Sequence, residues 1–325
     1  MKRLHFRILS LLLFIGILTN SAHAQFGDLL NKATKAAAAK GTKALGLDNI
    51  LKQPEAISTN FGDVNRTDEQ MPDFHNDQQY TPLTDLPKNP EGGYVLKAGH
   101  FEIINKSYCL KAGTYAPSSG DGYMYAPVLG KKKDIVTIIL KSAEKHSEVK
   151  QSDVQMLLWT IIARTKFSDY SGAVKETAIR LLTPKQLLQL EGGALGILPF
   201  DVVQKAKDQL PSELKLVFEA ENNIRNLVSS GNYSYAEFEK YAILAGMAPL
   251  RTDAPSGIWT CHPDGYYVRY FPSGYSQTKT QIYVPEDIIT RLDGKKLIYD
   301  ATDDIACPAN TGSQRLAQTN EVFSL

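Results

Sequence analysis

The chain has 325 residues, with Lys+Arg 36 against Asp+Glu 35 and a formal net charge of +1. This balance excludes the strongly basic surface on which nucleic-acid binding or bulk attraction to anionic lipid depends. We therefore expect partners among proteins or glycans, and no nucleic acid.

The first 24 residues have the three parts of a secretory signal peptide. A basic start that includes Lys2 precedes an apolar run over Ile8–Leu18, and Ala22–Ala24 supplies a small-x-small cleavage site. This run is shorter than the roughly 20 apolar residues of a membrane-spanning helix. We expect cleavage after residue 24, no transmembrane segment after it, and export to the periplasm, the cell surface or the extracellular medium.

Two segments of different composition follow. Residues 25–52 carry alanine and lysine at helical spacing, which predicts a leader helix. Residues 53–92 are polar and rich in Pro, Asn and Asp, a composition typical of a linker. His75 lies there beside two aspartates, but a solvated loop is the simpler interpretation, and the sequence predicts no metal site.

A mainly helical core domain is predicted over residues 93–250. It begins with a predicted β-hairpin, formed by Tyr94–Lys97 and Phe101–Leu110 around a turn that contains Gly99. Apolar periodicity and capping residues predict helices over Asp134–Glu144, Ser152–Arg164, Gly172–Leu182, Pro184–Glu191, Asp201–Leu210, Glu213–Val228 and Tyr235–Ala245. Seven of the nine residues from Val154 to Ile162 are apolar, so we expect that helix to be buried on all sides.

Residues 251–318 are predicted to form a small antiparallel β module. Pro-Asp-Gly and Pro-Ser-Gly separate short alternating strands, a pattern that indicates hairpins. Cys261 and Cys307 bracket these strands, and an exported chain meets oxidising conditions, so we expect a disulfide between them, worth about 3–4 kcal/mol. The predicted fold class is therefore α+β, with a helical core, a hairpin before it and a stapled β module after it.

Cys109 is then the unpaired cysteine of the three. One interpretation is a small buried hydrophobe. The other is a reaction with Gln155, which lies in the apolar helix on the same face as Trp159. Attack of the thiolate on the amide carbon would expel ammonia and leave an internal thioester, provided that a rigid fold positions both groups and excludes water. Residues available as walls are Tyr108, Tyr115, Tyr123 and Trp159.

The segment over residues 107–164 resembles the thioester domains of bacterial surface adhesins. It carries Tyr108-Cys109, then a Pro/Gly loop, then the run Val154–Trp159 in which Gln155 is the second residue. That family has a Tyr-Cys strand and a Thr-Gln-x-Ala-Ile-Trp helix. The resemblance implies that Cys109 and Gln155 are cross-linked, that Trp159 is the matching aromatic, and that the protein attaches covalently or non-covalently at a bacterial surface. It implies no cofactor.

Three other interpretations stay open. Ser152 and Gln155 fit a capping box, which would direct the glutamine to the start of its own helix. A cysteine hydrolase or transferase would need a histidine beside Cys109, and those available are His100, His146 and His262. A non-enzymatic structural or interaction module of the envelope would need neither. The sequence leaves open whether the protein is an enzyme, and favours one that is not.

Overall fold

The protein is described here by a computed structural model, which covers residues 55–64, 78–191, 210, 212–303 and 305–323. All of these residues belong to one structural unit, Gln53–Leu325. The predicted signal peptide over residues 1–24 and the leader helix over residues 25–52 lie outside the described residues. Helices and mixed sheets are both present, so the fold is α+β, as the sequence predicts.

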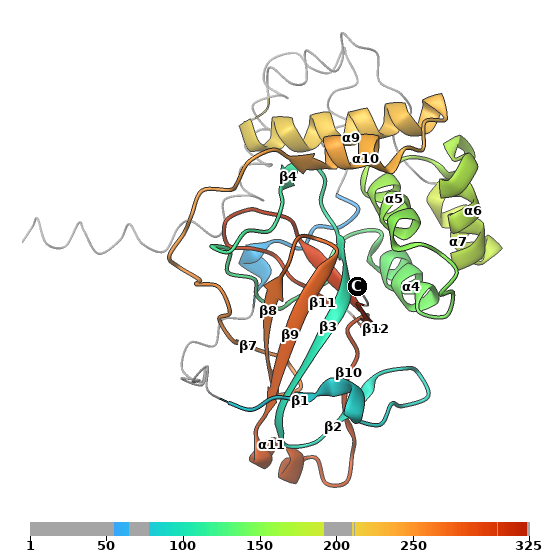
Figure 1. The fold of residues 1–325 in the computed structure, drawn as a ribbon. Coiled ribbons are helices and arrows are strands. Elements are labelled where there is room, and N and C mark those ends of the chain that lie inside the picture. Colours follow the sequence, from blue (N-terminus) through green and yellow to red (C-terminus); the bar gives the residue numbers. More distant parts are fainter. Residues whose placement is uncertain (1–54, 65–77, 192–209, 211, 304, 324–325) are drawn as a thin grey trace, which may run out of the picture. The chain divides into compact units, whose positions relative to one another are not determined.

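The main sheet is built around strand β3 (Gly99–Cys109) (Figure 1). Antiparallel strand β9 (Gln277–Val284) lies on one edge of β3. Parallel β1 (Thr81–Pro82) and antiparallel β12 (Leu316–Val322) also pair with β3. Beyond β9 come two further antiparallel strands, β8 (Tyr267–Pro272) and β7 (Thr260–Cys261).

Strand β3 extends beyond β9 at its carboxyl end. The β3–β9 register stops at the pair Lys106–Gln277, whereas β12 accompanies β3 on its other side as far as the pair Cys109–Leu316. At Cys109, one edge of β3 is therefore paired with a strand, and the other edge needs a different partner for its backbone groups.

The predicted hairpin turns of the C-terminal segment are confirmed. Strands β7, β8 and β9 follow one another as antiparallel neighbours. The turns between them contain Gly265 and Gly274, with φ of 92° and 68°, a conformation that favours glycine. These strands do not form a sheet of their own, because β9 pairs with β3 along eight residues. The segments 93–250 and 251–318 thus contribute to one sheet, and β1, from the segment expected as a linker, joins it.

The predicted hairpin over Tyr94–Lys97 and Phe101–Leu110 is wrong. Both strands exist, but β2 (Tyr94–Leu96) pairs with β10 (Leu297–Tyr299) in a separate sheet. Gly99, with φ of 133°, is the first residue of β3 and redirects the chain as that strand begins. The remaining small sheets pair β4 (Thr114–Tyr115) with β6 (Ile243–Leu244), and β5 (Ala126–Pro127) with β11 (Ile305–Ala306).

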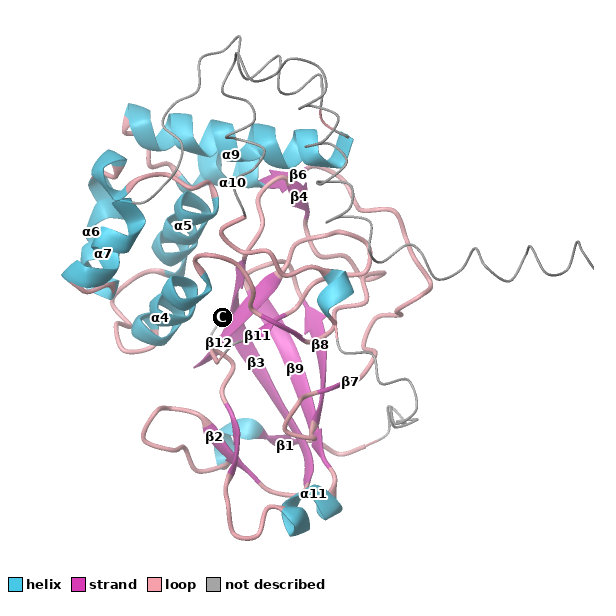
Figure 2. Cartoon of the chain, turned by 180° about the vertical axis from the view of Figure 1, so that it is seen from behind, coloured by secondary structure: helices cyan, strands magenta, loops and turns pink. Residues whose placement is uncertain are grey.

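A group of helices gathers beside one end of the main sheet (Figure 2). They are α4 (Lys133–Ala143), α5 (Gln151–Ile162), α6 (Gly172–Leu181), α7 (Pro184–Glu191), α9 (Ser212–Ser230) and α10 (Tyr235–Ala242), and a short α11 (Glu286–Arg291) follows β9. Single 3-10 turns cover Phe61–Asp63, Leu83–Asp85 and Phe167–Asp169. Six predicted helices are confirmed, and the one predicted over Asp201–Leu210 lies almost wholly outside the described residues.

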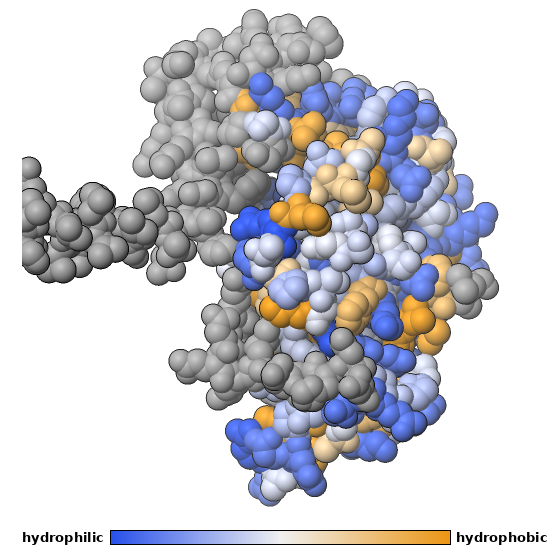
Figure 3. Space-filling view, turned by 60° about the vertical axis from the view of Figure 1, so that its left-hand side comes forward, coloured by the Kyte–Doolittle hydropathy of each residue, from blue (hydrophilic) through white to orange (hydrophobic). Residues whose placement is uncertain are grey.

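Helix α5 is the buried helix that its composition predicts. Every residue from Val154 to Ile162 is buried, and α5 contacts β3 on one side and α4, α6, α9 and α10 on others. The largest core cluster joins these helices to Tyr108, Cys109 and Leu110 of β3. On the face drawn in Figure 3, apolar and polar residues are intermixed.

Candidate functional site

Cys109 is the last residue of β3, and on the edge opposite β12 its backbone is paired by a side chain instead of a strand. Its N–H donates to Gln155 Oε1 at 2.8 Å, and its carbonyl oxygen accepts from Gln155 Nε2 at 3.0 Å. Cys109 is fully buried, and Gln155 is 2 % exposed. The amide of Gln155 therefore takes the place that a neighbouring strand would fill.

Gln151 makes a related contact one helical turn earlier, at Ser107, whose own N–H still donates to Ser276 O at 2.9 Å. Gln151 Nε2 donates to the carbonyl oxygens of Ser107 at 3.0 Å and Ser276 at 2.7 Å. Residues four apart share a helix face, so Gln151 and Gln155 together line the part of β3 that β9 leaves unpaired. These two contacts explain why polar residues occupy one face of an otherwise apolar helix.

The capping-box interpretation of Gln155 is wrong. The N-cap residue of α5 is Lys150, with no side-chain capping bond, and Ser152 is already inside the helix. Gln155 is directed at Cys109, as the thioester hypothesis expects. Its hydrogen bonds join the amide to the main chain of Cys109, however, and not to the sulfur.

The sulfur of Cys109 faces a second buried glutamine, Gln314. The thiol contacts Gln314 Oε1, and the carbonyl oxygen of Lys111 lies 2.8 Å from the same sulfur. Gln314 is fully buried, and its Nε2 donates to the carbonyl oxygens of Thr114 at 3.1 Å and Ala242 at 3.4 Å. Gln314 could not be found from the sequence, because no periodicity or motif connects residues 205 positions apart.

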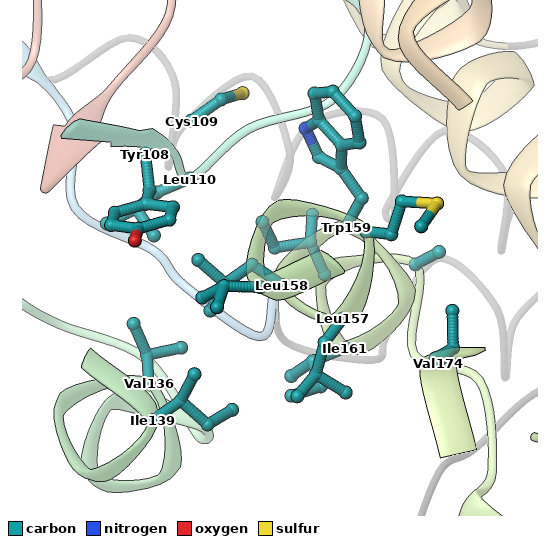
Figure 4. Close-up of a cluster of buried hydrophobic side chains, with 14 of the residues drawn as sticks. Tyr108, Cys109, Leu110, Val136, Ile139, Leu157, Leu158, Trp159, Ile161 and Val174 are labelled. Atoms are coloured by element: carbon teal, nitrogen blue, oxygen red, sulfur yellow. The ribbon is translucent and has the colours of Figure 1, made fainter. Parts of the chain in front are cut away.

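Trp159 forms part of the wall around the sulfur. Figure 4 shows its indole nitrogen on the ring edge that faces the Cys109 sulfur. The side chain is fully buried, and within the described part of the chain the indole N–H has no hydrogen-bond acceptor. Burial raises the pKa of the Cys109 thiol to about 12, while the nearby indole of Trp159 and the Lys111 backbone act in the opposite direction.

Two tyrosines and a glutamate cover the outer face of Trp159. The ring centroids of Tyr235 and Tyr275 lie 5.7 and 5.9 Å from that of Trp159. The two hydroxyls are 2.6 Å apart, and the Tyr275 hydroxyl donates to Glu239. These three residues are only partly buried, so they stand between solvent and the Trp159–Cys109 contact. These residues could not be assigned to the site from the sequence, since they come from α10 and from the β8–β9 turn.

The other predicted wall residues occupy different places. Tyr108 belongs to the same buried cluster as Cys109 and Trp159. Tyr115 contributes through its backbone, because its carbonyl oxygen accepts from the Gln314 N–H at 3.0 Å. Tyr123 is buried in the second core cluster, among residues of β8, β9 and β10. Figure 4 shows the Tyr108 ring and the Cys109 sulfur on opposite sides of β3, as neighbouring residues of a strand are expected to lie. The site is therefore walled mainly by Trp159 and the Tyr235–Tyr275 pair.

The predicted disulfide between Cys261 and Cys307 is wrong: all three cysteines are free. Cys307 is fully buried, with its sulfur 3.4 Å from Gln318 Nε2, and burial raises its pKa to about 12. Cys261 lies on the edge strand β7, partly exposed, with its sulfur toward the carbonyl oxygen of His262. One thiol thus belongs to the core and the other to the edge of the sheet, although their positions bracket the same strands.

The three candidate histidines of a cysteine hydrolase do not meet Cys109. His100 is nine positions from Cys109 on the same strand, which at about 3.3 Å per residue separates them by about 30 Å. His146 is exposed, with Nδ1 3.0 Å from Glu148. His262 stacks on Tyr266 with ring centroids 4.3 Å apart. The arrangement that a hydrolase needs is therefore not assembled from these residues.

Other kinds of site find no support in the described ranges. They contain no group of three or more His, Cys, Asp or Glu side chains that could hold a metal ion. Asp300 is occupied by Thr302 and Asn320, and Asp303 by Lys141. Within the same ranges no helix is long and apolar enough to cross a membrane. A groove of about 380 Å³ is lined by residues such as His262 and Lys295, and Cys109 is not among its lining residues.

Comparisons of the chain with protein-family models, with curated proteins and with solved structures find no match.

Proposed function

We propose that this chain is an exported attachment protein in which Cys109 and a buried glutamine form an internal thioester that reacts with amines on a partner protein or glycan. The observation that supports this proposal is the contact of one buried cysteine with two buried glutamine amides, Gln155 at its main chain and Gln314 at its sulfur. Gln155 is the partner that the sequence resemblance implies.

Formation of the thioester is balanced within the chain. The Cys109 sulfur attacks a glutamine amide carbon, the S–C bond forms and the C–N bond breaks. The thiol proton leaves on the amide nitrogen as ammonia. Amides resist thiols in water, so the reaction depends on fixed positioning and on exclusion of water. The burial of Cys109, both glutamines and Trp159 supports both conditions.

Attachment uses the stored acyl group once. A primary amine of the target attacks the thioester carbon, the N–C bond forms and the S–C bond breaks, and the Cys109 sulfur takes the proton that the amine releases. The target is then held by an amide bond. Because the acyl group is consumed, the chain acts in this proposal as an attachment device and not as an enzyme with turnover.

A second candidate function is a structural or interaction module of the cell envelope without covalent chemistry. One observation favours it: both polar ends of the Gln155 amide are already paired with the backbone of Cys109, which is a complete structural role. In that case the buried thiol, with its raised pKa, is a core group only.

Labelling with a fluorescent primary amine separates the two candidates. The purified mature protein is incubated with a cadaverine-type amine, denatured and examined for covalent fluorescence. The thioester proposal predicts label on the native chain and on the matched Cys261→Ala variant, and none on Cys109→Ala. Equal label on Cys109→Ala, or none on the folded native chain, would leave the non-covalent module as the function. Circular dichroism checks that each variant is folded.

A further inference from the structure

The geometry points to Gln314, and not Gln155, as the acyl partner of Cys109, an inference that rests on the proposed thioester. Two glutamine amides contact this residue, and they do so in different ways. Gln155 meets main-chain atoms, whereas Gln314 meets the sulfur. Only the sulfur can become the nucleophile.

The amide carbon of Gln314 lies next to the nucleophile. The Cys109 thiol contacts Gln314 Oε1, and that oxygen is joined to the amide carbon by one bond of about 1.23 Å. A shift of the Gln314 side chain by about the length of that bond would bring the amide carbon to the place beside the sulfur that its oxygen now holds. For Gln155 to react, its amide would first have to leave both backbone atoms of Cys109.

The amide nitrogen of Gln314 has two acceptors. It donates to Thr114 O at 3.1 Å and to Ala242 O at 3.4 Å, and Ala242 O also accepts the Gly113 N–H at 2.7 Å. Loss of ammonia from Gln314 would leave Ala242 O with a partner and remove one donor from Thr114 O, and loss of ammonia from Gln155 would remove one donor from the Cys109 carbonyl. The nitrogen contacts therefore do not separate the two candidates, whereas the contact with the sulfur does.

The remaining groups then have defined roles around Cys109. Gln155 fixes the main chain of Cys109, and so sets the direction of the sulfur. Trp159 offers its indole N–H on the side facing the sulfur, where charge develops as the thiol proton is lost. In the balanced step the S–C bond forms at the Gln314 amide carbon, the C–N bond breaks, and the thiol proton leaves with the nitrogen as ammonia.

Isotopically labelled methylamine identifies the acyl partner, because it leaves a stable N-methyl mark on whichever glutamine formed the thioester. Trypsin places the two candidates in separate peptides, Gln151–Arg164 and Leu297–Arg315. Tandem mass spectrometry is expected to find the mark on Gln314 in the native chain and on neither peptide in Cys109→Ala. A mark on Gln155 would overturn this inference and leave the thioester standing. No mark on either peptide would overturn both.

Two matched variants give an independent reading through intact mass. Gln314→Glu keeps the size of the side chain but removes the amide that would release ammonia, and Gln189→Glu makes the same change at an exposed position of helix α7. The inference predicts that the ammonia loss disappears in Gln314→Glu and persists in Gln189→Glu. Ammonia loss that persists in Gln314→Glu would overturn the inference. If Gln314→Glu fails to fold, the methylamine mark on the native chain still decides the question.

Discussion

Replacing Gln155 by methionine tests the structural part of the account, namely that this amide substitutes for a β-strand at Cys109. Methionine has similar size, so the change removes two hydrogen bonds without opening a large cavity. The Cys109 N–H and carbonyl oxygen, both buried, lose their partners. Each unpaired buried group costs about 1–3 kcal/mol, which gives a loss of about 2–6 kcal/mol in the free energy of unfolding.

The measurement is urea unfolding, followed by circular dichroism, with every variant in a Cys109→Ala background so that no thioester contributes. The matched control is Gln189→Met, because Gln189 is an exposed residue of helix α7. We expect the control to change the free energy of unfolding by less than about 0.5 kcal/mol. If Gln155→Met is as stable as that control, the amide does not complete the sheet edge and the reasoning about the site fails.

Three further predictions concern charge and protonation. Burial lowers the pKa of His262 to about 4 from its usual 6.5, so the unfolded state binds more protons between those values. The free energy of unfolding should therefore be unaffected by this group above about pH 6.5 and fall by up to about 3 kcal/mol toward pH 4. Urea unfolding of the native chain and His262→Gln at pH 7 and 4.5 checks this, and an equal loss in both would contradict it. Glu221 pairs with the buried Arg225, so Glu221→Gln should lower the free energy of unfolding in urea by about 3–5 kcal/mol. The surface change Glu237→Gln should lower it by less than about 0.5 kcal/mol. Similar values for the two variants would refute the pairing argument. Burial raises the pKa of Cys109 to about 12, so the thiolate fraction should rise about tenfold per pH unit between pH 7 and 9. The rate of ammonia release after refolding should rise with it. A flat pH profile of this rate would show that deprotonation does not limit the step.

The parts of the fold that could be predicted from the sequence are those with local causes. Nearly continuous apolar residues made α5 recognisable as a buried helix, and Pro-x-Gly turns made the β7–β8–β9 succession recognisable. The β2–β3 hairpin was wrong because pairing of neighbouring strands is only the commonest choice, and here β2 pairs with β10 some 200 residues later.

The candidate site was predictable only in part. The residue types of Cys109 and Gln155 placed them together, but the sequence could not show that the amide meets the backbone of Cys109. The Cys261–Cys307 pair was expected from cysteine number and compartment, which carry no information on which way a side chain points. Gln314 gave no signal, because its contact with Cys109 depends on the return of β12 along β3.

The intact mass of the purified mature protein tests the central claim most directly. The account predicts a mass lower by one ammonia than the sequence requires. Methylamine treatment is expected to add one methylamine to this mass. Cys109→Ala is expected to have the full mass of its own sequence before and after treatment. A native chain at its full mass, unchanged by methylamine, would contradict the internal thioester and leave Cys109 as a buried thiol in a non-covalent envelope module.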